Sequence, residues 1–104
     1  MAGVEHLNAA NFEAKTSKGV ALVDFWAPWC GPCRMMGPVL DAVAAAVGDK
    51  AVVGKVNVDE DADLAAKFGV RSIPAVFVLK DGQVAEQFVG VQDKQKLISA
   101  IEKA

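Results

Sequence analysis

The segment of residues 20–26, with the sequence VALVDFW, constrains the fold more than any other part of the chain. It is an almost unbroken apolar run, whereas a strand with one face in solvent alternates apolar and polar side chains. Such a run is typical of a strand that is buried on both faces of a sheet. We therefore expect residues 20–26 to form a central strand, in a sheet that helices cover on both sides.

Helical and extended patterns alternate along the rest of the chain. Asp59 and Asp93 are suitable N-caps, Gly48 is a suitable C-terminal stop, and residues 80–82 (KDG) indicate the turn of an antiparallel hairpin. The resulting prediction is helices at 12–18, 32–47, 59–68 and 94–103, with further strands at 51–58, 75–79 and 83–89. Strands that alternate with helices and end in a hairpin and a helix predict a mixed sheet.

The length of 104 residues suits one domain, residues 1–104, because no repeat, linker or low-complexity tract divides the chain. The 11 basic residues are spread along the chain and the net charge is −2, so we expect neither a nucleic-acid surface nor a membrane surface. Residues 1–6 show no secretory signal, and Asp24 interrupts the longest apolar run. We expect a cytoplasmic protein, unless the sequence is the mature form of a longer precursor.

The two cysteines, Cys30 and Cys33, lie between the predicted central strand and the helix that follows it. A bridge between them closes a very small loop and contributes little as a staple, so a reactive disulfide is a better interpretation than a structural one. Residues three apart in a first helical turn are neighbours, and the N-terminal end of a helix stabilises a thiolate. We expect Cys30 to be the exposed nucleophile and Cys33 to be the shielded resolving thiol.

The residues between the cysteines suit this arrangement. Pro32 fits the first helical position, where its missing N–H is not needed, and Gly31 leaves the space above Cys30 open to a substrate backbone. A zinc site is the poorer alternative, because structural zinc needs four ligands and the chain adds only the distant His6. We expect no metal, although zinc shared between two chains stays open as an alternative.

Asp24 is an acid among apolar neighbours on the predicted central strand. Burial there raises the pKa of a carboxyl, and Asp24 closely precedes the cysteines. It is therefore a candidate proton acceptor and donor for Cys33, directly or through a water; the alternative is a structural acid that is hydrogen-bonded to its surroundings. Lys55, on the next predicted strand, either pairs with Asp24 or is an exposed edge lysine.

Pro74 follows Ile73 immediately before a predicted strand. A proline fixed there, in the cis or the trans form, would leave the Ile73 backbone free to pair with an extended substrate. The alternative is an ordinary loop proline.

Several other side chains lie near the cysteines in the sequence. Trp29 is a candidate cover for the thiols or an apolar contact, whereas Trp26 is expected in the core. We expect Met35 and Met36 to pack on the buried face of the helix, with a place near its rim as the alternative for Met35. We expect Arg34 to be a solvated charge, and the alternative is that it favours a thiolate.

Four segments carry a family resemblance. Residues 24–33 (DFWAPWCGPC), 55–59 (KVNVD), 73–74 (IP) and 89–90 (VG) resemble the thioredoxin family in order and spacing, over essentially the whole chain. The resemblance implies an α/β thioredoxin fold, with a central mixed β-sheet flanked on both faces by four helices in the order βαβαβαββα. This order adds a first strand, to which the residue pattern assigns no range.

The resemblance also implies roles for individual residues. It implies a cis bond before Pro74 and a reactive Cys30 that Cys33 resolves, and it favours the proton-relay role of Asp24 and its pairing with Lys55. It further implies a substrate groove formed by Trp29, Gly31, Pro32, Ile73, Pro74, Val89, Gly90 and Val91.

The implied function is that of a protein disulfide reductase, which cycles between a dithiol and a disulfide and supplies electrons to disulfide-containing target proteins. The implied electron source is NADPH through a thioredoxin reductase, with no bound cofactor, and we expect a monomer. Gly31 and Pro32 resemble the reducing members, whereas a histidine between the cysteines would favour an oxidant. An oxidase or isomerase, and a binding module whose partners need only its reduced surface, are the alternatives.

Overall fold

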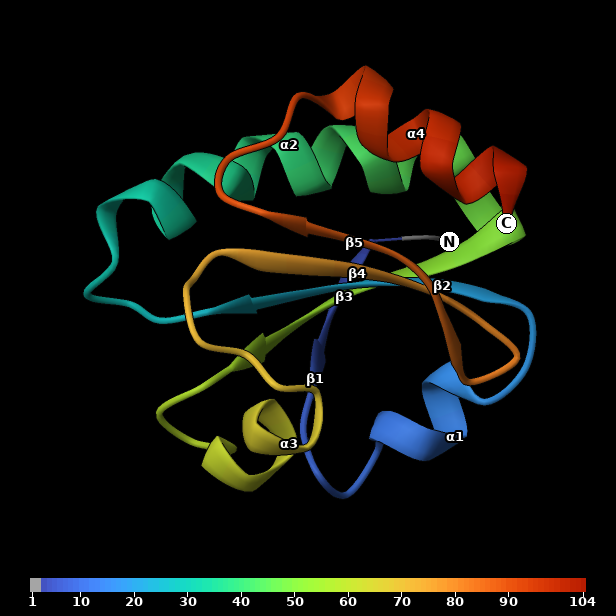
Figure 1. Ribbon diagram of the computed structural model, residues 1–104. Coiled ribbons are helices and arrows are strands. Elements are labelled where there is room, and N and C mark those ends of the chain that lie inside the picture. The colour runs from blue at the N-terminus through green and yellow to red at the C-terminus, as the bar shows by residue number, and fades with distance from the viewer. Residues whose placement is uncertain (1–2) are drawn as a thin grey trace.

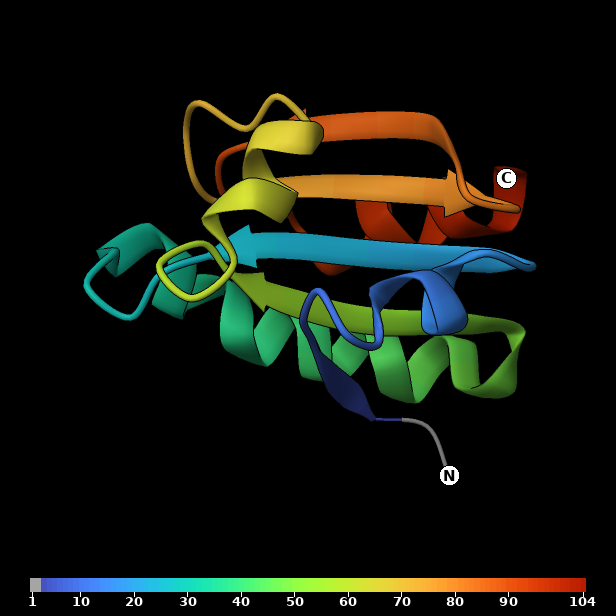
Figure 2. The same cartoon turned by 90° about the horizontal axis from the view of Figure 1, so that it is seen from below.

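A sheet of five strands forms the centre of the computed structural model, which describes residues 3–104. The strands are β1 (Val4–Leu7), β2 (Val20–Trp26), β3 (Ala51–Asn57), β4 (Ala75–Lys80) and β5 (Gln83–Val89). Their order across the sheet is β1-β3-β2-β4-β5 (Figure 2). The β1–β3 and β3–β2 pairs are parallel, and the β2–β4 and β4–β5 pairs are antiparallel. The prediction of a mixed sheet with residues 20–26 at its centre is confirmed.

Helices cover both faces of this sheet (Figure 1). They are α2 (Gly31–Val47) and α4 (Lys94–Lys103) on one face, and α1 (Phe12–Thr16) and α3 (Ala62–Lys67) on the other. The predicted thioredoxin fold, in the order βαβαβαββα, is confirmed; a short 3-10 turn, Gly48–Lys50, precedes β3.

The alternation of side chains along β2 places one acid beneath α2. Successive residues of a strand point to opposite faces. Leu22 packs into the core with Met36 and Leu40 of α2, whereas Val23 packs into the core on the opposite face. Asp24, two residues after Leu22, therefore points toward α2, as does Trp26.

The two short helices are fixed by an aromatic cluster on the other face. Neighbouring rings of the cluster lie with their centroids 5.3 to 5.5 Å apart, mostly edge to face. Its members are Phe12, Phe25, Phe68 and Phe77. Helices of five and six residues are marginal by themselves, so this packing rather than helix propensity stabilises α1 and α3.

Some predicted boundaries are wrong. α1 ends at Thr16 rather than at residue 18, and α3 begins at Ala62 after Asp61, not after Asp59. The reason for the later start is a turn that Asn57 organises: its side-chain oxygen accepts from the N–H of Asp59 at 2.8 Å, and its carbonyl accepts from the N–H of Asp61 at 3.0 Å.

Two local signals are confirmed. Asp81 and Gly82 have φ values of 51° and 83°, which suit the two-residue turn between β4 and β5. Asp93 caps α4, because its side chain accepts from the N–H groups of Gln95 and Lys96. In the part of the chain that the structure describes, no helix combines the length and the apolar character that crossing a membrane requires.

Candidate active site

The two cysteines form a disulfide at the start of α2, where the chain leaves the end of β2. Cys30 is the N-cap of the helix, and the Cys33 N–H donates a hydrogen bond to Cys30 Sγ at 3.2 Å. When the disulfide is reduced, this N–H and the positive end of the helix both stabilise a thiolate at Cys30. The helix begins at Gly31, so Pro32 occupies the second helical position and not the first.

The surroundings of the two sulfur atoms differ more than their exposure does. Cys30 is 6% exposed and Cys33 is 3% exposed, so the expected contrast in exposure is small in the disulfide form. Cys30 Sγ lies 3.9 Å from the Ile73 carbonyl oxygen, whereas Cys33 lines a cavity that also contains Asp24. One sulfur therefore faces the loop before β4, and the other faces the interior.

This cavity, about 200 Å³ in volume, lies between β2, β3 and α2. It is lined by Asp24, Trp26, Cys33, Arg34, Gly37, Leu40 and Lys55. Asp24 is 1% exposed, and its Oδ1 atom has no hydrogen-bond partner among residues 3–104. Burial raises the pKa of Asp24 from 3.8 to about 7, and the positive charge of Lys55 partly opposes this rise.

Lys55 reaches the same cavity because it is the register partner of Asp24 on the neighbouring strand β3. The expected ion pair is not formed within 4.0 Å; within residues 3–104 the one salt bridge joins Lys15 and Glu5. The Lys55 ammonium instead lies 4.5 Å from the centroid of the Trp26 ring. Its influence on Asp24 is therefore electrostatic rather than a direct hydrogen-bonded pair, and the alternative of an exposed edge lysine is wrong, because Lys55 is half-buried.

The two tryptophans have different environments. Trp26 is half-buried, and packs against the cysteines as well as facing the cavity. Trp29 is 66% exposed, and its Nε1 donates to Asp59 Oδ2 at 2.9 Å. The sequence pattern predicts Asp59 only as a helix N-cap, not as a partner of Trp29. A usable signal was its place just after β3, since the ends of parallel strands β2 and β3 meet at the same edge of the sheet.

Two of the segments that contribute predicted groove residues lie near Cys30: the loop of Ile73 is beside Cys30 Sγ, and Gly90 is bonded to that loop. The Ile73-Pro74 bond is cis, and the Pro74 carbonyl accepts from the Gly90 N–H at 2.8 Å, which joins the loop before β4 to the end of β5. Exposed members are Trp29, Gly31, Pro32, Val89 and Val91, and the half-buried ones are Ile73 and Gly90. Pro74 is buried, so its side chain is not exposed beside these residues.

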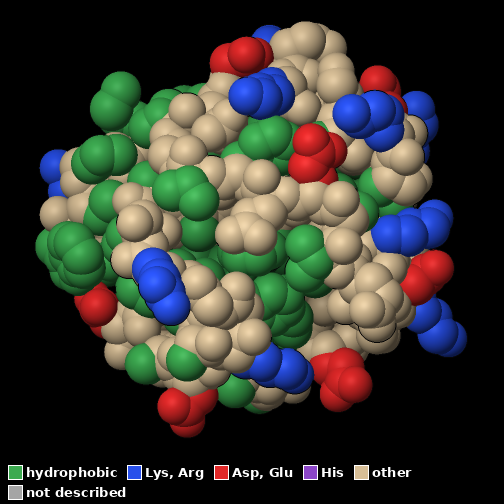
Figure 3. Space-filling view, viewed as in Figure 1, with side chains coloured by type: hydrophobic (Ala, Val, Ile, Leu, Met, Phe, Trp, Pro, Cys, Tyr) green, Lys and Arg blue, Asp and Glu red, His purple; other side chains and the backbone are tan. Residues whose placement is uncertain are grey.

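Met36 lies as predicted, whereas the places of Met35 and Arg34 differ from the main expectation. Met36 is fully buried as expected, but Met35 is 64% exposed. Arg34 is not simply solvated: its Nη1 donates to the Pro28 carbonyl at 3.0 Å and so ties the loop before α2 to the helix. Hydrophobic side chains gather on the surface at the end of the molecule where this loop lies (Figures 1 and 3).

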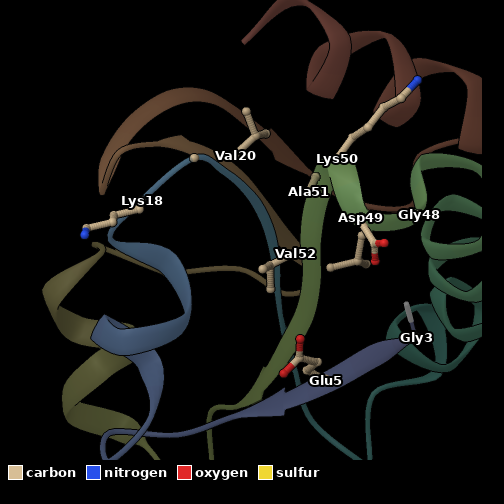
Figure 4. A pocket seen from close by; sticks show the side chains of 11 residues that line it. Gly3, Glu5, Lys18, Val20, Gly48, Asp49, Lys50, Ala51 and Val52 are labelled. Atoms are coloured by element: carbon tan, nitrogen blue, oxygen red, sulfur yellow. The ribbon is translucent and has the colours of Figure 1, made fainter. Parts of the chain in front are cut away.

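A second pocket, about 260 Å³ in volume, lies at the opposite end of β2 and β3 (Figure 4). Val20 and Ala51, the first residues of these two strands, line it together with charged side chains. Lys18 and Lys50 point away from each other, so their charges do not converge on a common point. Within residues 3–104, no group of three His, Cys, Asp or Glu side chains is arranged to hold a metal.

A disulfide at a helix N-terminus, beside a cis-proline loop and above a buried acid, defines the chain as a dithiol–disulfide oxidoreductase. The comparisons agree with this class. The sequence model of the thioredoxin family matches residues 3–103. The thioredoxin of Bacillus subtilis (strain 168) is 50% identical over 93 residues, 89% of each chain, and that of Staphylococcus aureus (strain Mu50) is 49% identical over 94 residues, 90% of each chain.

Solved structures give the same result. A mutant thioredoxin from Halobacterium salinarum NRC-1 superposes with a TM-score of 0.90 at 37% identity, over 97% of this chain and 89% of that chain. The chain belongs to the thioredoxin family, and it is a thiol–disulfide reductase whose redox-active pair is Cys30 and Cys33.

Proposed function

We propose that the chain acts as a monomeric, single-domain reductase (residues 1–104) of protein disulfides in the cytoplasm, with Cys30 as the nucleophile and Cys33 as the resolving thiol. The observation that carries this assignment is the different surroundings of the two sulfurs. Cys30 faces the Ile73 carbonyl at the groove, and Cys33 faces the cavity of Asp24.

The reaction proceeds by two successive exchanges. The Cys30 thiolate attacks one sulfur of a target disulfide; a mixed disulfide forms, and the other target sulfur leaves as a thiolate that takes a proton. Cys33 then loses its proton and attacks Cys30 Sγ, which breaks the mixed disulfide and releases the second target thiolate. The target disulfide gains two electrons, and the Cys30–Cys33 dithiol loses them.

Asp24 takes the proton from Cys33 in the second exchange, directly or through a water in the cavity. Its burial supports this role, because a pKa of about 7 lets the carboxyl accept and release protons near neutral pH. An exposed aspartate would be ionised throughout that range. Lys55 and Trp26 line the cavity with the acid, and the positive charge of Lys55 lowers the pKa of Asp24 against the effect of burial.

The target chain lies in the groove around Cys30. The Ile73 carbonyl lies beside Cys30 Sγ, where an extended target backbone can pair with the loop that contains Ile73 and Pro74. The exposed apolar side chains of Trp29, Val89 and Val91 supply contact area at the same place.

The electrons come from NADPH through a thioredoxin reductase, as the family relationship implies, and the chain carries electrons from that enzyme to its targets without a bound cofactor. The test is a coupled assay that contains NADPH, a bacterial thioredoxin reductase, insulin and the purified chain. We expect NADPH consumption and insulin reduction that depend on the chain. If chemically reduced chain reduced insulin but the coupled assay consumed no NADPH, the assignment of a thioredoxin reductase as the electron source would be wrong.

The same assay tests whether the two cysteines carry the activity. The double variant Cys30→Ser, Cys33→Ser should lose all insulin reduction. Activity retained by this variant would contradict the proposed cysteine roles. Size-exclusion chromatography with light scattering tests the monomer: a mass near 10.9 kDa is expected, and a stable dimer would contradict it.

A further inference from the structure

We propose that Gln92 is a positioning residue for target binding. Its side chain closes residues 89–92 into a compact turn, and its backbone fixes that turn to α2. The proposal rests on the proposed function, in which this turn forms one wall of the groove around Cys30.

Gln92 makes three hydrogen bonds across this turn. Its Nε2 donates to the Val89 and Gly90 carbonyls, each at 3.2 Å. Its backbone N–H donates to Met36 Sδ at 3.4 Å, and Met36 is fully buried within α2. Gly90 has a φ of +92°, a conformation that favours glycine, so the chain changes direction within the turn. One residue therefore satisfies two carbonyls of the turn and anchors it to the helix that carries the cysteines.

A second anchor holds the other side of the turn. The Gly90 N–H donates to the Pro74 carbonyl at 2.8 Å, next to the Ile73 carbonyl that lies 3.9 Å from Cys30 Sγ. The turn is thus held between α2 and the cis-proline loop. The groove depends on both attachments, because each fixes one side of the wall relative to Cys30.

The turn presents apolar contact area at a fixed place. Val89 is 58% exposed and Val91 is 45% exposed, and they flank Gly90. A rigid apolar surface binds more tightly than a mobile one, because less conformational entropy is lost on association. Gln92 should therefore act on target affinity and leave the chemistry of the two sulfurs unchanged.

The decisive variant is Gln92→Glu, which keeps the shape of the side chain but removes both N–H donors. The matched control is Gln87→Glu, which adds the same charge on an exposed position of β5. With insulin as the target, we expect Gln92→Glu to raise KM about fivefold, as the loss of one to two neutral hydrogen bonds predicts. The kcat, the reduction potential and the rate with a small aromatic disulfide should match those of the control.

Amide hydrogen exchange of the disulfide form gives an independent readout. The N–H groups of Gly90 and Gln92 should exchange about tenfold faster in Gln92→Glu, and at the wild-type rate in Gln87→Glu. Met36→Leu, which removes the sulfur acceptor at similar volume, should accelerate exchange at Gln92. If Gln92→Glu does not fold, Gln92→Ala removes the same donors without the added charge and has the same expected result.

The outcomes separate the two proposals. Failure of the wild-type chain to reduce insulin would contradict the proposed function itself. An active wild type together with a Gln92→Glu KM within twofold of the control would overturn the role of Gln92. A change in kcat or in the reduction potential as large as the change in KM would also overturn it, because the variant would then disturb the cysteines.

Discussion

Asp24 of β2 and Cys33 of α2 line the same cavity, which has a volume of about 200 Å³. The carboxyl is buried, its Oδ1 has no hydrogen-bond partner among residues 3–104, and its pKa is raised to about 7. A buried acid without a partner destabilises a fold, since its charged form loses hydration without compensation. The position thus lowers stability, and it places a carboxyl with a pKa near neutral in the cavity that Cys33 also lines.

The first prediction concerns the pH dependence of stability. The unfolded chain releases the Asp24 proton near pH 3.8, whereas the folded chain keeps it until about pH 7. Between these values the folded state binds more protons, so the contribution of Asp24 to the free energy of unfolding falls as pH rises and levels off above pH 7. Asp24→Asn should stabilise the oxidised protein by about 4 kcal/mol at pH 8, because a shift from 3.8 to about 7 is about three pKa units, and by little at pH 4.

Urea unfolding at pH 4, 6 and 8 measures this difference. The matched control is Asp63→Asn, since Asp63 is an exposed acid of α3, and its effect should stay within about 0.5 kcal/mol at every pH. A stability difference between Asp24→Asn and wild type that did not grow with pH would contradict the raised pKa.

Turnover of Asp24→Asn should also fall at neutral pH, although the fold is stabilised.

The second prediction concerns Lys55. Its positive charge lowers the pKa of Asp24 against the larger effect of burial. Lys55→Gln should therefore raise that pKa further, because a neutral amide no longer favours the carboxylate. The ¹³C chemical shift of the Asp24 carboxyl, followed from pH 4 to pH 10, reports the change. An unchanged or lower pKa in Lys55→Gln would show that the lysine does not act on the acid.

The third prediction separates the roles of the two cysteines. Cys33→Ser should accumulate a mixed disulfide between Cys30 and a target protein, because nothing resolves it. Cys30→Ser should accumulate much less, since the remaining Cys33 thiol faces the interior cavity. Non-reducing electrophoresis and mass spectrometry of the two variants after incubation with oxidised insulin count the adducts. Equal trapping by both variants would reverse the assignment of nucleophile and resolving thiol.

The fourth prediction concerns Gly54 in β3. A Cβ atom there would lie 2.6 Å from Leu7 Cδ1 and 3.1 Å from the Glu5 carbonyl oxygen of the neighbouring strand β1. Gly54→Ala should therefore destabilise the protein by about 1 to 3 kcal/mol, as overpacking of a core does. The loss of stability that Gly54→Ala causes should be smaller when it is measured in a Leu7→Ala background, where the obstructing side chain is absent.

Gly37→Ala is the control for Gly54→Ala, because a Cβ at Gly37 meets nothing within 4 Å. Gly37 lies inside α2, where alanine is the better helix former, but it precedes Pro38, whose ring disfavours a Cβ on the residue before it, so the two effects oppose each other and this variant should stay within about 0.5 kcal/mol of wild type. Equal changes in the urea midpoint for the two glycine variants would contradict the packing argument.

The sequence predicts those parts of the fold that depend on local patterns. The apolar run of β2, the helical spacing of α2 and the cap at Asp93 each act within a few residues, and all three predictions are confirmed. The predicted start of α3 is wrong because the Asn57 side chain accepts a hydrogen bond from the Asp59 N–H and forms a turn there. Asp59 therefore lies within this turn and is not the N-cap of the helix. β1 was not located because a strand of four residues gives only a weak pattern.

The site depends more on contacts between distant residues. The cysteine motif and the buried acid are visible in the sequence because each lies on a recognisable element. The position of the Lys55 ammonium over Trp26 and the attachment of Gln92 to Met36 join residues that lie far apart in the sequence, and no spacing rule encodes them. The bond from Arg34 to Pro28 spans only six residues, but it depends on the path of the loop before α2. The exposure of Met35 likewise depends on which elements cover the helix, and not on the helix pattern.

The reduction potential of the Cys30–Cys33 pair is the measurement that tests the central claim most directly. Equilibration with dithiothreitol buffers, followed by mass spectrometry of alkylated thiols, gives this potential. A reductase should have a value in the range that characterises thioredoxins, about −270 mV, whereas values near about −180 or −120 mV characterise disulfide isomerases and oxidases. We expect the strongly reducing value. A potential in the isomerase or oxidase range would contradict the assignment of the chain as a donor of electrons to protein disulfides.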